Sequence, residues 1–209
     1  MTEPDGVSAP VPVRHYRGKR VLDLAVVAVA AVPVAIIGGA SWLAVRATSS
    51  GPGLFRQERV GAGGEPFTVL KLRTMTVDDP GGSAFPDEDR ITKVGRFLRR
   101  TSLDELPQLL NVARGEMSIV GPRPTLAYQV DRYTPRQRGR LSVRPGVTGL
   151  AQVRGRNRLS WPERIELDLD YIERQSLRLD LRLIVESITV VVKGDGVDGH
   201  PTDDPLASP

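Results

Sequence analysis

The chain has 209 residues, of which 40% are hydrophobic, and a formal net charge of +4. This length is enough for one cored domain and a membrane segment, and too short for two large domains. Because the chain has no cysteine, disulfides, thiol nucleophiles and Cys-based metal sites are excluded. The two histidines, His15 and His200, lie near the chain ends, which argues against a Ser-His-Asp site or a His-rich metal site. Chemistry is therefore expected to use Asp, Glu, Lys and Arg.

The charges are distributed unevenly along the chain. A Gly/Pro-rich stretch at the end carries Asp195, Asp198, Asp203 and Asp204, whereas the middle of the chain carries most of the arginine. The middle is therefore suited to binding anions. Nucleotide phosphates, lipid headgroups and nucleic acid all meet that description, and composition does not choose among them.

A disordered tail over residues 1–18 is predicted, followed by a membrane helix over residues 19–48. The apolar stretch Val21 to Val45 is longer than the ~20 residues that a helix needs to cross a bilayer core. Pro33 cannot donate a backbone hydrogen bond and should bend the helix there. Basic residues flank both ends, which favours placing both on the cytoplasmic side. These signals predict a re-entrant helix that breaks at Pro33 and returns to the same face.

Two other interpretations of this stretch remain open. A cleaved signal peptide fits the basic lead and the small residues Gly38-Gly39-Ala40, but its apolar core would exceed the usual length of about 7–15 residues. A single-pass helix with a tolerated kink also fits the composition.

Residues Leu54 to Met75 are predicted to form a β-hairpin, with two extended runs around the turn Gly61-Ala62-Gly63-Gly64. Alternation with a period of two places Lys71 and Arg73 on one face of the second run. Two neighbouring cations could bind phosphate, or they could simply face solvent.

The next segment predicts a loop and then a basic helix. Residues Asp78 to Asp89 are rich in Pro, Gly and Asp, which is typical of a loop. From Arg90 to Arg100 the apolar residues recur at helical spacing among arginines. This amphipathic helix could lie on anionic lipid, or it could be an ordinary surface helix.

The adjacent acids Asp104 and Glu105 stand in an arginine-rich chain, where a carboxylate among cations is a candidate nucleophile toward phosphate. The run Ser102 to Glu105 also matches a capping box, in which Glu105 would only close a helix start. Pro107 argues against that register and favours a helix that starts near Asp104, with the proline in its first turn. The two acids would then lie at a helix N-terminus, which attracts phosphate. Capping and catalysis both remain open at this point.

Three turns downstream each hold an arginine in stiff or glycine-containing backbone. They are Gly121-Pro122-Arg123-Pro124, Arg144-Pro145-Gly146 and Gly155-Arg156-Asn157. A rigid backbone lowers the entropy lost when a guanidinium binds an anion. Three such turns and an acid pair in one short domain favour phosphate chemistry.

The chain resembles the bacterial sugar transferase family, the small monotopic phosphoglycosyl transferases, from about Lys19 to Val197. The resemblance is carried by a series of ordered motifs: Lys19–Asp23, Lys71–Met75, Ser102–Leu109, Gly115–Ser118, Gly121–Pro124, Arg144–Gly149 and Gly155–Asn157. It implies a re-entrant membrane helix broken at a proline, here Pro33. It also implies transfer of a sugar phosphate from a nucleotide sugar, usually a UDP-sugar, to a membrane polyprenol phosphate, with release of UMP.

The resemblance also implies a role for each candidate residue. Asp104 would be the nucleophile that forms an aspartyl-phosphosugar intermediate. Glu105 would be catalytic by helping to hold Mg²⁺. The basic candidates for binding phosphate or nucleotide are Lys71, Arg73, Arg123, Arg144 and Arg156. Asp168 is a candidate for metal or nucleotide binding, and a charged helix face explains it equally well.

Strict alternation of Leu177, Leu179, Leu181 and Leu183 predicts a strand, whereas the resemblance implies a helix along the membrane surface. Following the resemblance, we expect an α/β, mostly helical fold. A re-entrant membrane helix leads into one compact cytoplasmic catalytic domain over residues 49–197 with a small β-hairpin. Residues 198–209 are expected to form a disordered acidic tail.

The expected location is the cytoplasmic (inner) membrane of a bacterium, with the catalytic domain facing the cytoplasm. The expected partners are a nucleotide sugar, polyprenol phosphate, anionic membrane lipids and downstream glycosyltransferases that continue a glycan or exopolysaccharide. One competing class is a non-catalytic membrane-anchored binder of anionic lipid or RNA. Aromatic residues make up only 5% of the chain and no nucleic-acid motif occurs, so we expect no nucleic-acid partner. Another competing class is an Asp-based membrane phosphatase, which would pass its intermediate to water.

Overall fold

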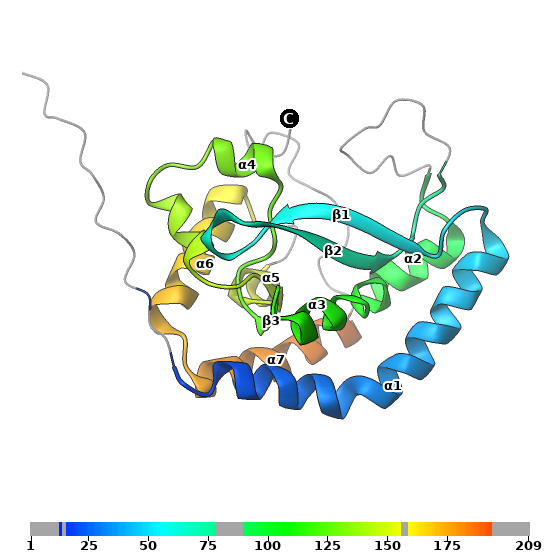
Figure 1. The fold of residues 1–209 in the computed structure, drawn as a ribbon, viewed down its shortest axis with the longest axis horizontal. Coiled ribbons are helices and arrows are strands. Elements are labelled where there is room, and N and C mark those ends of the chain that lie inside the picture. Colours follow the sequence, from blue (N-terminus) through cyan, green and yellow to red (C-terminus); the bar gives the residue numbers. More distant parts are fainter. Residues whose placement is uncertain (1–12, 14–15, 78–89, 156–158, 194–209) are drawn as a thin grey trace, which may run out of the picture.

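The computed structural model describes residues 13, 16–77, 90–155 and 159–193 (Figure 1). The predicted loop 78–89, Arg156 and the expected acidic tail 198–209 lie outside these residues. In chain order the described elements are α1 (Lys19–Thr48), β1 (Leu54–Val60), η1 (Ala62–Gly64), β2 (Pro66–Leu72), α2 (Lys93–Arg100), η3 (Leu103–Glu105), α3 (Gln108–Arg114), β3 (Ser118–Val120), α4 (Ala127–Asp131), η4 (Gln137–Ser142), β4 (Gly146–Thr148), α5 (Leu150–Arg154), α6 (Trp161–Arg174) and α7 (Leu177–Lys193). The expectation of a mostly helical fold with a small hairpin is confirmed.

Helix α1 spans 30 residues with Pro33 inside it, close to its midpoint. The helix bends strongly along its length but remains one element (Figure 1). Such a bend is expected where proline removes a backbone donor and pushes against the preceding turn. Among the described residues, α1 is the helix long and apolar enough to cross a membrane, with a mean hydropathy of 2.5 in its most apolar window. Most of that window is exposed, and its exposed apolar side chains include Val29, Val32, Ile36 and Leu43.

Strands β1 and β2 form the predicted hairpin. They pair antiparallel from Leu54 opposite Leu72 to Val60 opposite Pro66. The turn between them uses Gly63 and Gly64 at φ of +71° and +86°, a region that glycine adopts without steric cost. A second, parallel pair joins β3 to β4, with Ser118 opposite Gly146.

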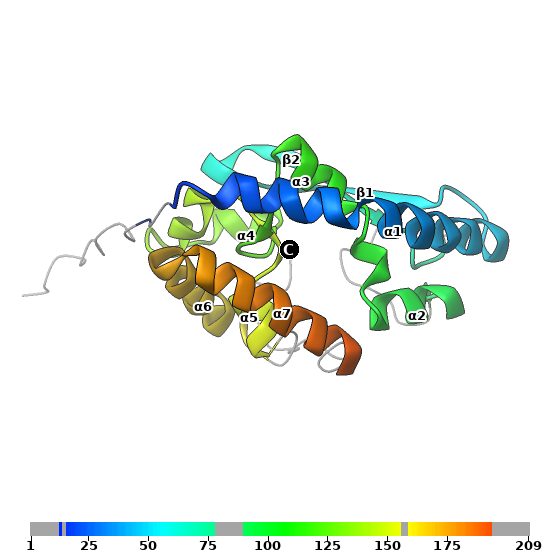
Figure 2. The same ribbon diagram turned by 90° about the horizontal axis from the view of Figure 1, so that it is seen from below.

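The main core lies between the hairpin, α3, β3, α6 and α7. Its buried members include Val69, Val112, Met117, Ile119, Ile165, Leu169, Ile172 and Leu183. Helices α1 and α7 both lie at the bottom of the domain in Figure 1 and are both seen in front in the view from below (Figure 2). These helices hold β3, and with it the loop that follows β3.

The C-terminal segment is helical, so the resemblance predicted α7 correctly and the alternating pattern was misleading. In a helix, leucines four residues apart share a face. Leu179 and Leu183 therefore pack against the core, whereas Leu177 and Leu181 remain exposed. The alternation arises from two such pairs on different faces.

The predicted basic helix is also present as α2. Thr92 caps it by accepting a hydrogen bond from the Gly95 amide. Leu98 is buried against a small cluster with Val45 and Leu72, while Phe97 is exposed. Helix α2 thereby connects the end of α1 to the hairpin.

Candidate active site

The acid pair lies on the short 3₁₀ turn η3. Ser102 precedes this turn in the left-handed region at φ +55°, and its side chain makes no capping hydrogen bond. The capping-box alternative is therefore wrong. Helix α3 begins at Gln108, with Pro107 at its cap position, rather than near Asp104 as expected. The turn presents both acids ahead of the helix, so Glu105 is available for other contacts.

Two cations converge on Glu105. The Lys71 ammonium lies 2.7 Å from Oε1 of Glu105, and Arg123 Nη2 lies 3.0 Å from the same oxygen. Burial alone would raise the pKa of Glu105, but the charges and hydrogen bonds of Lys71 and Arg123 outweigh it and hold the pKa well below its usual range. Glu105 is therefore ionised. Its other oxygen, Oε2, has no hydrogen-bond partner among the described residues.

Asp104 is buried, with 8% of its surface exposed, and its carboxylate accepts no hydrogen bond from the described residues. Burial and the charge of Glu105 raise the pKa of Asp104 to about 6, although Lys71, Arg123 and Arg99 act in the opposite direction. An ionised carboxylate without bound donors keeps its lone pairs available for attack on an electrophile. We call Asp104, Glu105, Lys71 and Arg123 the acid-pair site.

Two further arginines border this site and were not predicted for it. Arg99, on α2, donates from Nε to the Thr74 hydroxyl at 2.9 Å, and its charge acts on Asp104. Arg59, on β1, has its pKa lowered to about 10, mainly by burial and then by the charge of Arg123. Directly paired residues of a hairpin share a face. The predicted hairpin therefore could have indicated that Arg59 shares a face with Lys71, since Arg59 pairs with Phe67 and Lys71 with Phe55.

Arg73 and Arg144 point elsewhere. Arg73 is buried, and its guanidinium binds the carbonyls that follow α1, including Ser49 O at 2.9 Å. These carbonyls are bound by Nη1 and Nη2 of Arg73, and its phosphate contact stays a prediction. Arg144 is exposed and lines a different hollow, with Lys19 and Tyr171, of about 280 Å³.

Asp168 is paired with Arg140 and not with the acid pair. The Arg140–Asp168 distance is 2.7 Å, and the two side chains are 1% and 2% exposed. The described residues contain no group of three or more His, Asp or Glu that could hold a metal. A buried guanidinium already neutralises Asp168, and its role as a metal ligand stays a prediction. Glu105, with its Oε2 unbonded among the described residues, still suits Mg²⁺, which is usually held by one or two carboxylates together with substrate phosphates and water.

Comparison with known proteins identifies the family. Residues 14–194 match the model of the bacterial sugar transferase family. The chain is 45% identical over 188 residues to a UDP-glucose:undecaprenyl-phosphate glucose-1-phosphate transferase of Caulobacter vibrioides. The aligned residues make up 85% of this chain and 70% of that protein. It is 46% identical over 154 residues to the uncharacterized sugar transferase EpsL of Bacillus subtilis, covering 73% and 76% of the two chains. A protein of Escherichia coli with the same name as the Caulobacter enzyme is 45% identical over 153 residues, which is 68% of this chain and 33% of that longer protein. The chain belongs to the bacterial sugar transferase family.

Proposed function

We propose that the protein transfers a sugar 1-phosphate from a nucleotide-activated sugar to a polyprenol phosphate. Four relatives at 45–49% identity carry the name UDP-glucose:undecaprenyl-phosphate glucose-1-phosphate transferase, which supports a UDP-sugar donor and an undecaprenyl phosphate acceptor. The products are then a polyprenyl diphosphate sugar and UMP. The observation that carries the proposal is the Asp104 carboxylate, which is buried, accepts no hydrogen bond from the described residues and lies beside a cation-bound Glu105.

In the first half-reaction, Asp104 attacks the phosphorus that bears the sugar. A bond forms between a carboxylate oxygen and this phosphorus, and the bond from phosphorus to the bridging oxygen breaks, so that UMP leaves with that oxygen. Lys71 and Arg123 lie within 3.0 Å of Glu105, where their charges also favour a bound diphosphate.

In the second half-reaction, an oxygen of the polyprenol phosphate attacks the same phosphorus. The bond from phosphorus to Asp104 breaks, and the carboxylate is regenerated. The fixed positive charges stabilise the five-coordinate phosphorus in both steps.

We also propose that the reaction uses Mg²⁺, held by the free oxygen of Glu105 together with substrate phosphates and water. When bound, the ion would neutralise charge on the diphosphate and on the departing UMP. Turnover is then expected to stop after exhaustive EDTA treatment and to return when Mg²⁺ is added. Full activity in EDTA would contradict this role.

We propose that α1 enters the cytoplasmic membrane, bends near Pro33 and returns to the cytoplasmic side. The exposed apolar surface of α1, the bend and the basic flanks support this topology. Because the chain has no natural cysteine, single cysteines at positions 10 and 200 can be labelled unambiguously with an impermeant thiol reagent in intact cells. Both should remain protected, whereas labelling of one site alone would indicate a spanning helix.

The covalent mechanism is tested by supplying a UDP-sugar without acceptor lipid. The enzyme should release up to one UMP per active site and gain the mass of one phosphosugar on the peptide that contains Asp104. A membrane phosphatase would instead release sugar phosphate into water continuously. If protein that turns over with lipid shows neither adduct nor acceptor-independent UMP, then covalent catalysis is rejected.

A further inference from the structure

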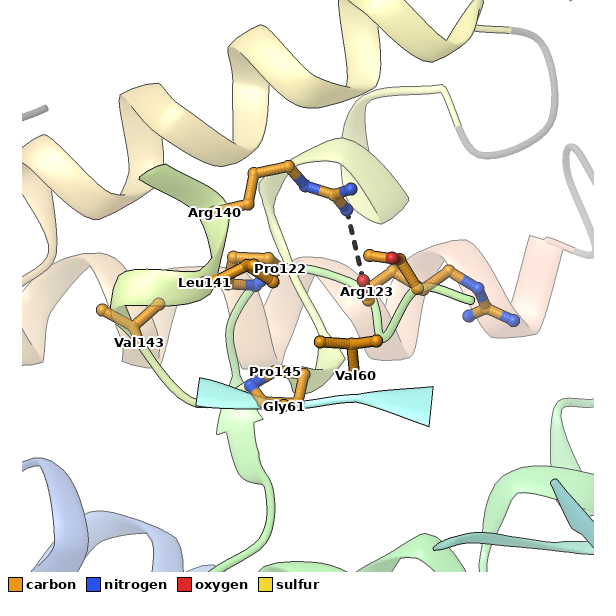
Figure 3. A pocket seen from close by; sticks show the side chains of 9 residues that line it. Val60, Gly61, Pro122, Arg123, Arg140, Leu141, Val143 and Pro145 are labelled. Carbon is orange, nitrogen blue, oxygen red and sulfur yellow. Dashed lines mark hydrogen bonds between the residues drawn. The ribbon is translucent and has the colours of Figure 1, made fainter. Parts of the chain in front are cut away.

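The loop that carries Arg123 is held at two successive carbonyl groups by two arginines from different elements. Arg140 Nη2, from η4, donates to the carbonyl of Arg123 at 3.2 Å. Arg59 Nη1, from β1, donates to the carbonyl of Pro124 at 3.3 Å. Figure 3 shows the Arg140 guanidinium bound to the Arg123 backbone, while the Arg123 side chain points away from it. The backbone is fixed on one side, and the Arg123 guanidinium is presented on the other.

Arg140 is itself held rigidly. Its Nε donates to Asp168 at 2.9 Å, its Nη1 donates to the Tyr133 hydroxyl, and its guanidinium lies 5.9 Å from the centre of the Trp161 ring. With 1% of its side chain exposed, it cannot rotate toward solvent. A buried ion pair gains little net stability, because removing both charges from water costs about as much as their attraction returns. Here the ion pair instead fixes the direction in which the Arg140 guanidinium donates to the loop.

Arg59 supports the neighbouring carbonyl from the hairpin. Its Nε and Nη2 donate to the side-chain oxygen of Gln57 at 3.1 and 2.6 Å, which leaves Nη1 for Pro124. One residue further on, the Val60 amide donates to the Thr125 carbonyl at 2.9 Å. Three consecutive carbonyls, those of Arg123, Pro124 and Thr125, are therefore bound from outside the loop.

The result of this support is the contact between Arg123 and Glu105. Almost half of the Arg123 side chain is exposed, so burial does not hold it in place, yet its Nη2 lies 3.0 Å from Glu105. The positive charges of Arg59 and Arg123 repel each other. Arg59 nevertheless stays close to Arg123, because it is hydrogen-bonded to the carbonyl of Pro124, the next residue in the loop. The cationic surface is thus fixed before an anion arrives, which lowers the cost of binding and orienting a diphosphate.

We propose that Arg140 and Arg59 are positioning residues that fix Arg123 in the direction of Glu105 and of the substrate diphosphate, with Asp168 and Tyr133 holding Arg140. This inference deepens the proposed function and rests on it. It also gives Asp168 a role, through Arg140, that needs no metal.

The proposal is tested by a double-mutant cycle between Arg140 and Arg123. Arg140→Lys keeps the charge beside Asp168 but cannot bind Asp168, Tyr133 and the loop at once. A misplaced guanidinium on Arg123 should lower acceptor-independent UMP release ~10- to 100-fold. Arg123→Ala by itself should already release UMP slowly. Adding Arg140→Lys to it should lower UMP release by less than about 2-fold, because the guanidinium that Arg140 positions is gone. Equal losses in both backgrounds would overturn the proposal, since they would indicate a general structural role.

The matched control is Arg136→Gln. Arg136 binds Glu166 at 2.8 Å and so also joins the η4 region to α6, but this ion pair is exposed and does not touch the loop. The UMP release of Arg136→Gln should match that of the unmodified protein.

If Arg140→Lys does not fold, as judged by circular dichroism in detergent, Tyr133→Phe replaces it in the cycle with an expected few-fold loss of UMP release. Full activity of Tyr133→Phe and of Arg59→Lys would then overturn the proposal. Absence of UMP release from the unmodified protein with any UDP-sugar would instead contradict the proposed function.

Discussion

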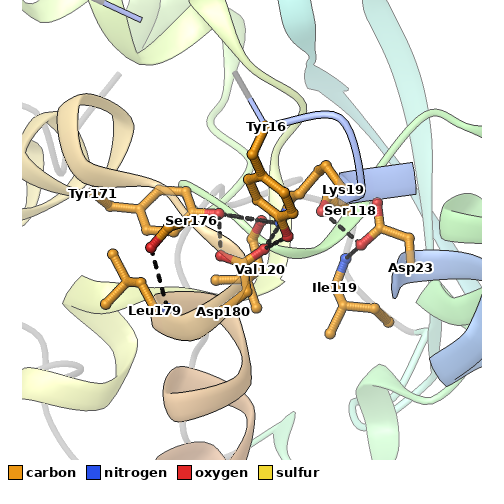
Figure 4. A network of polar contacts seen from close by, with 10 residues as sticks. All are labelled: Tyr16, Lys19, Asp23, Ser118, Ile119, Val120, Tyr171, Ser176, Leu179 and Asp180. Carbon is orange, nitrogen blue, oxygen red and sulfur yellow. Dashed lines mark hydrogen bonds and ion pairs between the residues drawn. The ribbon is translucent and has the colours of Figure 1, made fainter. Parts of the chain in front are cut away.

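Two polar clusters in this protein contain similar residues and differ in how completely their oxygens are hydrogen-bonded. In the first, which we call the α1-start network, Asp180 accepts from Lys19 and Tyr16 at Oδ2, each at 2.5 Å, and from Tyr171 at Oδ1 at 2.8 Å (Figure 4). In the acid-pair site, two donors share one oxygen of Glu105, and Asp104 accepts no hydrogen bond from the described residues.

The difference separates an acid that holds structure from one that can react. Asp180 is completely buried and bound at both oxygens, so it is neither accessible nor nucleophilic. It connects the first turn of α1 to α6 and α7, and thereby sets how the apolar helix leaves the domain. The Asp104 carboxylate accepts no hydrogen bond from the described residues, so its burial disfavours the charged form, and the nearby cations partly offset this effect.

The largest expected effect comes from Asp104→Asn. The amide keeps the shape of the side chain but removes the anionic nucleophile, so the phosphosugar adduct should disappear and turnover should fall by at least ~1,000-fold. Thermal unfolding should be unchanged or shifted upward, because no bonded charge is lost. A variant that still forms the adduct would contradict the assignment of the nucleophile.

For Asp180→Asn we expect a loss of stability without a loss of the phosphosugar adduct. Lys19 would lose its charged partner within a buried network, which should lower the free energy of unfolding by about 3 kcal/mol. This value is at the low end for buried pairs because 19% of the Lys19 side chain reaches solvent. At low temperature the remaining folded protein should still form the adduct.

Asp170→Asn provides the control for this comparison in a denaturant titration. Asp170 makes an exposed ion pair with Arg174 on α6, whose loss should cost less than about 0.5 kcal/mol. Equal destabilisation by the two variants would show that the α1-start network has no special structural role.

A smaller effect is expected from pH. The pKa of Asp104 is raised to about 6, and only the ionised form attacks phosphorus. Acceptor-independent UMP release should therefore rise with pH, with a midpoint near 6, and should be ~10-fold lower at pH 5 than at pH 8. Lys71→Gln should move the midpoint upward, because Lys71 lowers the pKa of Asp104. A rate that is flat from pH 5 to pH 8 would be inconsistent with this environment.

The smallest expected effect is that of Tyr16→Phe in the α1-start network. It removes one of the hydroxyls bound to Asp180 while Lys19 and Tyr171 remain. The free energy of unfolding should fall by about 1 kcal/mol, with turnover unchanged at a temperature where the protein is folded. A loss of turnover without a loss of stability would place this network in the catalytic machinery.

Local patterns predicted much of this molecule because they depend on near neighbours. Apolar length and Pro33 indicated a bent helix, alternation around a glycine turn indicated the hairpin, and apolar spacing indicated α2. The candidate residues Lys71, Asp104, Glu105 and Arg123 were named from motifs, and the structure brings them together.

Some contacts could not be predicted because the side-chain partners come from distant parts of the chain. Nothing near Arg73 in sequence shows that its guanidinium binds the carbonyls after α1, and nothing near Asp168 shows that Arg140 neutralises it. The leucine alternation of α7 was ambiguous until packing separated its two faces.

By itself, the sequence determined the apolar helix, the hairpin, the acid pair and the absence of thiol chemistry, since each follows from residue type and local spacing. Only the tertiary structure decided which charges are bound and which are left open. Asp180 and Asp168 are buried and paired with cations that reach them from other elements, whereas Asp104 has no such bound partner among the described residues. The physical reason is that a carboxylate's reactivity depends on its burial and its donors, and both are set by residues far away in the chain.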